Sequence, residues 1–228
     1  MAYIFVNLKR FDVPRRLGGI CSEDDPQHWI ETILRETVTG GIAGIEGASI
    51  VYLLPDALLI PSVRVLQEVG SSGGALPEIG TQGVFREDVK PGGNFGAFTT
   101  NLPAAAAVNL GATWSIIGHS EERKDKLGLL SACNESAGTT DAMLRCVNTI
   151  INQEVGCALE AGIDVLLCMG ETAEERGEGT FEEQKPRIRE SLRMQVELGL
   201  KDVASYLPKR RIVIGYEPIW AIGPGKTP

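Results

Sequence analysis

Short apolar runs recur along the chain, and segments with helical periodicity follow them. Because the apolar residues stand at consecutive positions, each run is typical of a strand that is buried on both faces, as in a parallel sheet. The predicted strands span residues 3–6, 49–54, 77–82, 114–117, 164–169 and 211–216. Six strand-then-helix units with no clear boundary between them predict a single α/β domain over residues 1–228.

One helix is especially well marked. Asp25 and Pro26 are typical of a helix cap and first turn, and Gly40 follows the last turn. Between these signals the apolar residues fall on one helical face: Trp29, Ile30, Ile33, Leu34, Thr37 and Val38. Further helices are expected over residues 103–108 and 181–200.

Two architectures are compatible with this alternation, a doubly wound open sheet and a (β/α)8 TIM barrel. Polar residues capable of chemistry end most of the runs: Asn7, Lys9, Gln82, His119, Ser120, Glu171 and Glu217. Such residues can converge only if the strand ends form a ring, whereas an open sheet concentrates its site at one switch point, usually after a Gly-x-Gly-x-x-Gly turn. Residues 7–10, Asn-Leu-Lys-Arg, lack that turn, so the sequence favours the barrel.

The composition excludes several classes of protein. A net charge of −8 argues against nucleic acid as a partner, because a phosphate backbone needs a basic face. Five cysteines without a Cys-x-x-Cys pair fit reduced thiols better than a disulfide framework. Two histidines are too few for a His-rich metal site. No run is long enough to span a membrane and no signal-peptide pattern is present, so we expect a cytoplasmic protein.

The last stretch, residues 215–228, places Glu217 at the end of an apolar run. A lone glutamate in such a position is often only solvated or paired with a lysine. Here Pro218 restricts Glu217 to extended geometry, and Gly223 and Gly225 allow the next loop to bend and present backbone N–H groups. A carboxylate beneath a closable apolar loop is typical of a general base that is kept away from water.

His119 and Lys9 each allow a structural and a chemical interpretation. His119 either caps the following segment or, held neutral by the positive end of a helix, acts as a hydrogen-bond donor. Lys9 either extends to solvent or faces an anion at the barrel mouth. The remaining residues of note are assigned structural roles: Cys168 packs in a strand, residues 171–183 form a solvated loop and helix start, and His28 lies on the surface.

Together these motifs resemble the triosephosphate isomerase family. Its loop motif, Tyr-Glu-Pro-Val-Trp-Ala-Ile-Gly-Thr-Gly-Lys-Thr, is matched by residues 216–227 except at Ile219 and Pro224. Its Gly-His-Ser-Glu-Arg-Arg motif is matched by residues 118–123, with Glu122 in place of the first arginine. The family's Asn-Trp-Lys, Gly-Ala-Phe-Thr and Cys-Ile-Gly-Glu are matched, in the same order, by residues 7–9, 96–99 and 168–171.

The resemblance implies an enzyme of glycolysis and gluconeogenesis that interconverts dihydroxyacetone phosphate and D-glyceraldehyde 3-phosphate. It implies that Glu217 moves a proton between adjacent substrate carbons and that neutral His119 polarises the carbonyl. Lys9 would neutralise charge on the substrate and on the enediolate, and Asn7 would orient the oxygens. No cofactor and no metal are expected, since proton removal beside a carbonyl needs only a base and an electrophile.

Other residues receive binding or supporting roles by the same resemblance. The N–H of Gly223 would bind the substrate phosphate, and Ser120 would contact the substrate region and hydrogen-bond Glu217 while the loop is open. Glu121 and Thr99 would support the site. The resemblance implies a homodimer in which Thr99 reaches the neighbouring subunit, and Pro224 is expected to narrow the motion of the loop.

Several departures from the family pattern leave alternatives open. Residues 84–93 look inserted in the loop that forms the family's dimer, Thr100 and Asn101 stand where a glutamate is expected, and about twenty extra residues lie within 127–152. A non-catalytic barrel that binds a sugar phosphate, or an isomerase of another phosphorylated sugar, therefore remains an alternative. In each case the expected partner is a small phosphorylated sugar.

The number of predicted strands is smaller than the barrel requires. Closure takes eight strands, and the phosphate site is commonly built from the loops after strands seven and eight. We therefore expect a C-terminally incomplete barrel. The chain would be part of a longer polypeptide lacking roughly sixty residues here, at about thirty per unit, or a fragment of low stability.

Overall fold

The structure is a computed structural model that describes residues 2–70, 73–133 and 140–222. Its sheet has six parallel strands in the order β1-β2-β3-β4-β5-β6. They are β1 (Ala2–Asn7), β2 (Ala48–Leu54), β3 (Glu78–Thr81), β4 (Trp114–Ile117), β5 (Asp164–Met169) and β6 (Ile212–Tyr216). The order follows the chain without reversal, so the sheet is that of a partial (β/α) barrel and not of a doubly wound fold.

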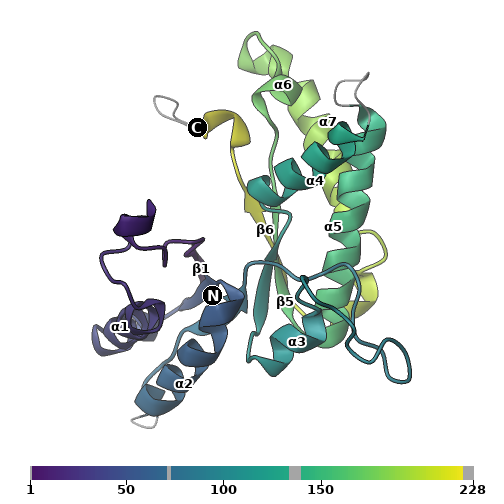
Figure 1. Cartoon of the computed structure of the whole chain (residues 1–228). Helices are drawn as coiled ribbons and strands as arrows, with labels where there is room; N and C mark the ends of the chain where they lie inside the picture. Colours follow the sequence, from purple (N-terminus) through teal and green to yellow (C-terminus); the bar gives the residue numbers. More distant parts are fainter. Residues whose placement is uncertain (1, 71–72, 134–139, 223–228) are drawn as a thin grey trace.

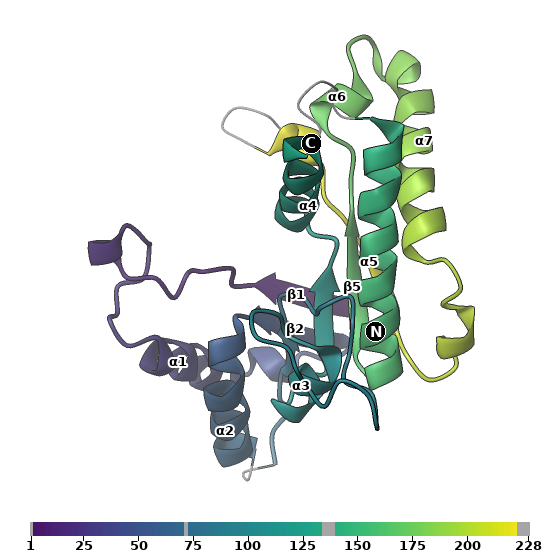
Figure 2. The ribbon, with the colours of Figure 1, turned by 45° about the vertical axis from the view of Figure 1, so that its right-hand side comes forward.

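Helices connect the strands and cover the outside of the curved sheet (Figure 1). They are α1 (Pro26–Thr39), α2 (Leu59–Gly70), α3 (Ala104–Asn109), α4 (Ser120–Ala132), α5 (Asp141–Ala161), α6 (Ala173–Arg176) and α7 (Phe181–Gly199). The predicted start of α1 is confirmed, because the Asp25 side chain accepts the N–H groups of Gln27 and His28 and Pro26 opens the helix. Figure 2 shows α4, α5 and α7 together on one flank and α1 with α2 on the other.

Two apolar layers pack against the sheet. The outer layer lies between strands and helices and includes Leu54, Ile117 and Leu167. The inner layer lines the concave face: Val51, Leu53, Trp114, Ile116, Leu166 and Cys168. The Trp114 ring on β4 lies 5.3 Å from the Tyr3 ring on β1, although these strands are not neighbours in the sheet. Contact across the concave face requires the sheet to curl as a barrel wall does.

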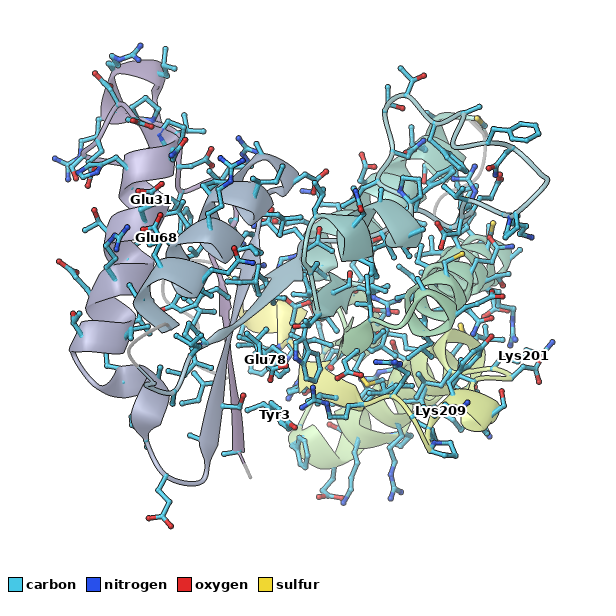
Figure 3. All side chains as sticks on the ribbon, turned by 90° about the horizontal axis from the view of Figure 1, so that it is seen from below. Tyr3, Glu31, Glu68, Glu78, Lys201 and Lys209 are labelled. Carbon is cyan, nitrogen blue, oxygen red and sulfur yellow. The ribbon has the colours of Figure 1, made fainter. Side chains whose placement is uncertain are left out.

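A polar cluster around Arg211 closes the amino end of the strands. Arg211 donates to the Tyr3 hydroxyl at 2.6 Å and to Glu78 at 3.2 Å, and it pairs with Asp164. Figure 3 shows Tyr3 and Glu78 close together between the two helical flanks. Burial disfavours the guanidinium charge, but the hydrogen bonds to Tyr3 and Asp164 outweigh this effect and raise the pKa of Arg211. This filled end leaves the carboxyl ends of the strands for a binding site.

The prediction that every strand is buried on both faces is wrong for the two edge strands. The central strands β2, β4 and β5 are largely buried, as expected. In contrast, Ile4 of β1 is 46% exposed and Ile214 of β6 is 45% exposed. Their side chains lie on the outer face, which the helices of the described chain cover mainly over the centre of the sheet. Among the described residues, no helix is both long and apolar enough to cross a membrane.

Candidate active site

His119 and Glu217 meet at the carboxyl end of the sheet. Gly118 follows β4 with φ of +76°, and a Cβ there would lie 2.8 Å from the Cys168 carbonyl oxygen, so the turn requires glycine. His119 then caps α4. Glu217 follows β6, and its N–H donates to the Met169 carbonyl at 2.8 Å. The two side chains come from strands on either side of β5, which places them on the same cavity wall.

The cavity has a volume of ≈ 470 Å³. Its polar wall carries His119, Glu217, Lys9, Ser120 and Glu121, so five of the residues assigned from the sequence converge there. The cavity is also lined by apolar residues of α4, α5, α7 and the segment after β6: Leu127, Leu144, Val147, Met194, Ile219 and Ile222. Further polar residues complete the lining: Arg123, Lys124, Asn148, Thr172, Glu175, Ser191 and Gln195.

The hydrogen bonds define the state of the imidazole. The Glu121 N–H donates to His119 Nδ1 at 3.3 Å, so Nδ1 carries no proton. His119 Nε2 lies 3.0 Å from Glu217 Oε1 and therefore carries the ring proton, which it donates to the carboxylate. Both interpretations of His119 hold, because the same ring caps α4 and presents a neutral N–H donor to the cavity.

Both oxygens of Glu217 are engaged. Oε1 accepts from His119, and Oε2 accepts the Ser120 N–H at 2.9 Å. The contact expected between Ser120 and Glu217 is present, with the backbone N–H as its donor. The carboxylate must leave at least one of these contacts before either oxygen can bind another group.

Lys9 is held by a small network. Its Nζ lies 2.9 Å from Glu121 Oε1, which supplies the anionic partner that a lysine at a cavity mouth needs. The same hydrogen bond lowers the pKa of Glu121, against a smaller opposing effect of burial. Lys9 has φ of +44°, and Asn7 Oδ1 supports this turn by accepting the Lys9 N–H at 2.9 Å. Gln82 Nε2 donates to the Lys9 carbonyl at 2.8 Å.

Asn7 and Gln82 thus shape the turn that presents Lys9. Within the part of the chain that the structure describes, Asn7 is not on the cavity wall. Gln82 had no assigned role in the sequence, and only its position at the end of a predicted strand marked it.

One expected site residue does not lie with this group. Thr99 is on an exposed stretch of the loop between β3 and α3 and is absent from the described cavity wall. Gly223, like the prediction made for Pro224, lies outside the described residues.

Arg123 is a further residue that the sequence analysis missed. It donates to the Gly118 carbonyl at 2.6 Å, to the Cys168 carbonyl at 3.0 Å and to Asn148 Oδ1 at 2.8 Å. These bonds tie the ends of β4 and β5 to α5. Within the matched motif 118–123, Arg123 was visible only as a charged residue.

The expectation that residues 171–183 are solvated is wrong at its first position. Glu171 is completely buried. It accepts a hydrogen bond from Arg176 at 2.8 Å and one from the Tyr216 hydroxyl at 3.1 Å. The Arg176 guanidinium in turn lies 4.0 Å from the centroid of the Trp220 ring. The carboxylate is buried because a cation and a hydroxyl satisfy it, and it anchors the segment that follows Glu217.

The structural roles of Cys168 and His28 are confirmed. Cys168 is 3% exposed in the inner layer, and burial together with the Glu217 charge raises the pKa of its thiol to about 12. His28 lies on the surface at the start of α1. Within residues 2–70, 73–133 and 140–222, no three His, Cys, Asp or Glu side chains gather as metal ligands would.

A curled sheet of consecutive parallel strands, with an imidazole–carboxylate pair at its carboxyl end, defines the class of the (β/α)-barrel proteins, whose sites lie at the same end of the strands. The sequence model described as triosephosphate isomerase matches residues 55–228. The chain belongs to the triosephosphate isomerase family.

Individual relatives agree with this assignment. The chain is 34% identical over 174 residues to triosephosphate isomerase from Oleidesulfovibrio alaskensis, covering 75% of this chain and 57% of that protein. It is 31% identical over 196 residues to the enzyme from Nitratidesulfovibrio vulgaris, covering 83% and 66%. The chain thus spans less than two thirds of the length of these relatives.

A solved structure supports the fold. The crystal structure of triosephosphate isomerase from Bartonella henselae superimposes with a TM-score of 0.62 at 25% identity, covering 96% of this chain and 68% of that chain. The comparison matches the curled parallel sheet described above.

Proposed function

We propose that this protein interconverts dihydroxyacetone phosphate and D-glyceraldehyde 3-phosphate. The observation that carries the proposal is the contact of 3.0 Å between His119 Nε2 and Glu217 Oε1, with Nδ1 accepting a backbone N–H. A neutral ring donor beside a carboxylate is what proton transfer next to a carbonyl requires. The names of the relatives point to the same reaction.

In this reaction Glu217 removes a proton from the hydroxymethyl carbon of dihydroxyacetone phosphate. The electron pair moves into the new carbon–carbon double bond, and His119 donates its Nε2 proton to the carbonyl oxygen. His119 then takes the proton of the neighbouring hydroxyl, while Glu217 returns its proton to the adjacent carbon. The product is the aldehyde isomer, and both residues regain their starting protonation.

The other residues act around this pair. The substrate displaces Glu217 as the acceptor of the His119 N–H, which frees the carboxylate for its carbon. Lys9 neutralises the charge that grows on the substrate oxygens, with Asn7 holding the Lys9 turn. We assign the N–H of Gly223 to binding of the substrate phosphate. The Ser120 N–H holds Glu217 before the substrate binds, and Glu121 holds Lys9 in the same state. The chain works without a resident cofactor in this proposal.

Two alternative functions are less well supported. An isomerase of a longer phosphorylated sugar is less well supported, because the relatives compared above are named triosephosphate isomerase. A non-catalytic binding protein has no need of a neutral imidazole donor in contact with a carboxylate.

The free cysteines and the family's metabolic role suggest that this protein is located in the cytoplasm.

A coupled assay tests the proposal. Purified full-length protein should turn over D-glyceraldehyde 3-phosphate, with dihydroxyacetone phosphate formation followed through an NADH-linked dehydrogenase. Saturable binding of the triose phosphate without turnover would establish the non-catalytic alternative instead. Turnover only of a longer sugar phosphate would establish the other.

We also predict a homodimer. The loop that carries Thr99 exposes Phe95 by 87%, and the loop after β1 exposes Leu17 by 66% and Ile20 by 61%. Apolar groups on two long loops suit an interface between copies of the chain, in which Thr99 supports the neighbour's site. Analytical ultracentrifugation at micromolar concentration should give twice the monomer mass. A monomer alone would refute the dimer and the role of Thr99.

A further inference from the structure

Side chains of α4 bind both backbone polar groups of Gly118, the residue before His119. The Gly118 N–H donates to Glu122 Oε2 at 2.6 Å, and the Gly118 carbonyl accepts from Arg123 Nε at 2.6 Å. Two consecutive helix residues thus fix the two peptides that flank the Cα of Gly118, and the second of these peptides leads into His119. Glu122 stands where the family motif has arginine, and an arginine has no acceptor for this N–H. The contact therefore belongs to this chain's own sequence.

Glu122 is itself held by a cluster that reaches a second helix. Lys126 Nζ donates to Glu122 Oε1 at 2.6 Å and lies 2.9 Å from Glu154 Oε1 on α5. Lys126 thus joins the two carboxyl groups, which interact strongly enough to influence each other's pKa. The side chain of Glu154 is only 5% exposed. We refer to these three residues as the Glu122–Lys126–Glu154 cluster.

We propose that Glu122 is a positioning residue for His119, and that it holds the Gly118–His119 backbone only while the carboxyl group of Glu154 is protonated. The proposal rests on the isomerase function proposed above. It extends that function because the protonation of Glu154 on α5 would then influence the position of His119 and the rate of the reaction. Helix α5 itself contributes no side chain to the contact between His119 and Glu217.

The position of the proton follows from the geometry. Two carboxyl groups that share one ammonium group cannot both ionise cheaply, so one of them keeps its proton. Burial raises the pKa of Glu154 to about 9, and the Glu122 charge adds to the effect. Burial opposes the charge of Glu122 too, but the bonds from Glu154 and Lys126 outweigh it and lower the pKa of Glu122. Glu154 Oε2 is buried and has no hydrogen-bond partner among the described residues, so we assign the proton to this oxygen, directed toward Glu122.

The sign of the pH effect is fixed by this assignment. Below about pH 9 the cluster holds one carboxylate, one ammonium and one neutral acid. As pH rises through about 9, Glu154 becomes negatively charged and repels the Glu122 carboxylate. The hydrogen bond from the Gly118 N–H to Glu122 is then weakened. Burial lowers the pKa of Lys126, but Glu122 outweighs this and raises it, so Lys126 stays charged. The other charged residues on the neighbouring cavity of ≈ 700 Å³ are Asp56, Arg86 and Asp125.

The test is the pH dependence of kcat for full-length wild type and three variants. In wild type, kcat should fall about tenfold between pH 8 and pH 10, with KM changed less than about threefold. Glu154→Gln keeps a donor for Glu122 that cannot ionise, so kcat at pH 7.5 should stay within about threefold and the fall above pH 9 should disappear. Glu122→Gln weakens the bond to Gly118, and kcat should drop about tenfold at pH 7.5 with little change in KM. Glu160→Gln, an exposed position on α5, is the matched control and should follow wild type.

A second measurement does not need turnover. The Gly118 amide proton, bonded to a carboxylate, should resonate far downfield in an ¹H–¹⁵N spectrum and move with a midpoint near pH 9 in wild type. In Glu154→Gln it should stay in place across that range. An alkaline fall in kcat that persists in Glu154→Gln, or a wild-type Gly118 signal that ignores pH, would overturn the proposal. A Gly118 titration in a protein without triose phosphate turnover would instead keep the cluster and reject the proposed function.

Discussion

Glu217→Gln should lower kcat for D-glyceraldehyde 3-phosphate by about a thousandfold, because the amide cannot take the proton that the reaction moves. The substitution keeps the size of the side chain and an acceptor for His119, so the cavity should be preserved. KM should change by less than about threefold, since the loss falls on the transition state. Steady-state kinetics in the coupled assay measure both quantities.

Glu175→Gln is the control for this experiment. Glu175 lies on the same cavity wall, accepts the Thr172 N–H at 2.8 Å and is bonded by Ser191 Oγ. It makes no contact with His119 in the described structure, so its variant should retain activity within about threefold. Near-normal turnover of Glu217→Gln would show that another group is the base.

Glu171→Leu should destabilise the protein by about 3 kcal/mol, because it leaves Arg176 mostly buried beside an apolar side chain and removes the acceptor of Tyr216. The value lies at the lower end for a broken buried ion pair, since Arg176 keeps Gln184 and the Trp220 ring as partners. Urea unfolding followed by circular dichroism should show a lower midpoint and an unchanged slope.

The double variant Glu171→Leu/Arg176→Met separates a broken pair from simple loss of packing. Removing both charges should restore at least half of the lost stability, because no unpaired ion remains in the interior. If the double variant were as unstable as the sum of its single changes, the cost would not come from the uncompensated arginine.

The strands could be predicted because each apolar run has a length and pattern that only a sheet buries well. The runs at 114–117 and 164–169 were predicted to the residue. The exposure of Ile4 and Ile214 could not be predicted in the same way. Their local sequences look like those of β2 and β5, and only the position of a strand within the sheet decides whether helices cover its outer face.

The candidate site was predictable in its main residues and not in its supports. His119, Glu217 and Lys9 stand at strand ends, and parallel strands bring their ends together. Glu171 looked solvated because it opens a charged stretch, while the hydroxyl that helps to bury it lies 45 positions away on Tyr216. The link from Glu122 through Lys126 to Glu154 joins two helices whose relative position no local pattern encodes.

The Arg211 cluster bears on how the chain is made. Strands β1 and β2 can pair once residue 54 has been synthesised, but the Tyr3 hydroxyl meets its guanidinium partner across a separation of 208 positions. At about 5–20 residues per second, that interval is on the order of ten to forty seconds. Until Arg211 has been synthesised, the Tyr3 and Trp114 rings lack the guanidinium that covers them. The amino end of the incomplete sheet then exposes aromatic surface that can bind other unfolded chains. A ribosome-bound chain of this protein is therefore most in need of shielding shortly before β6 emerges.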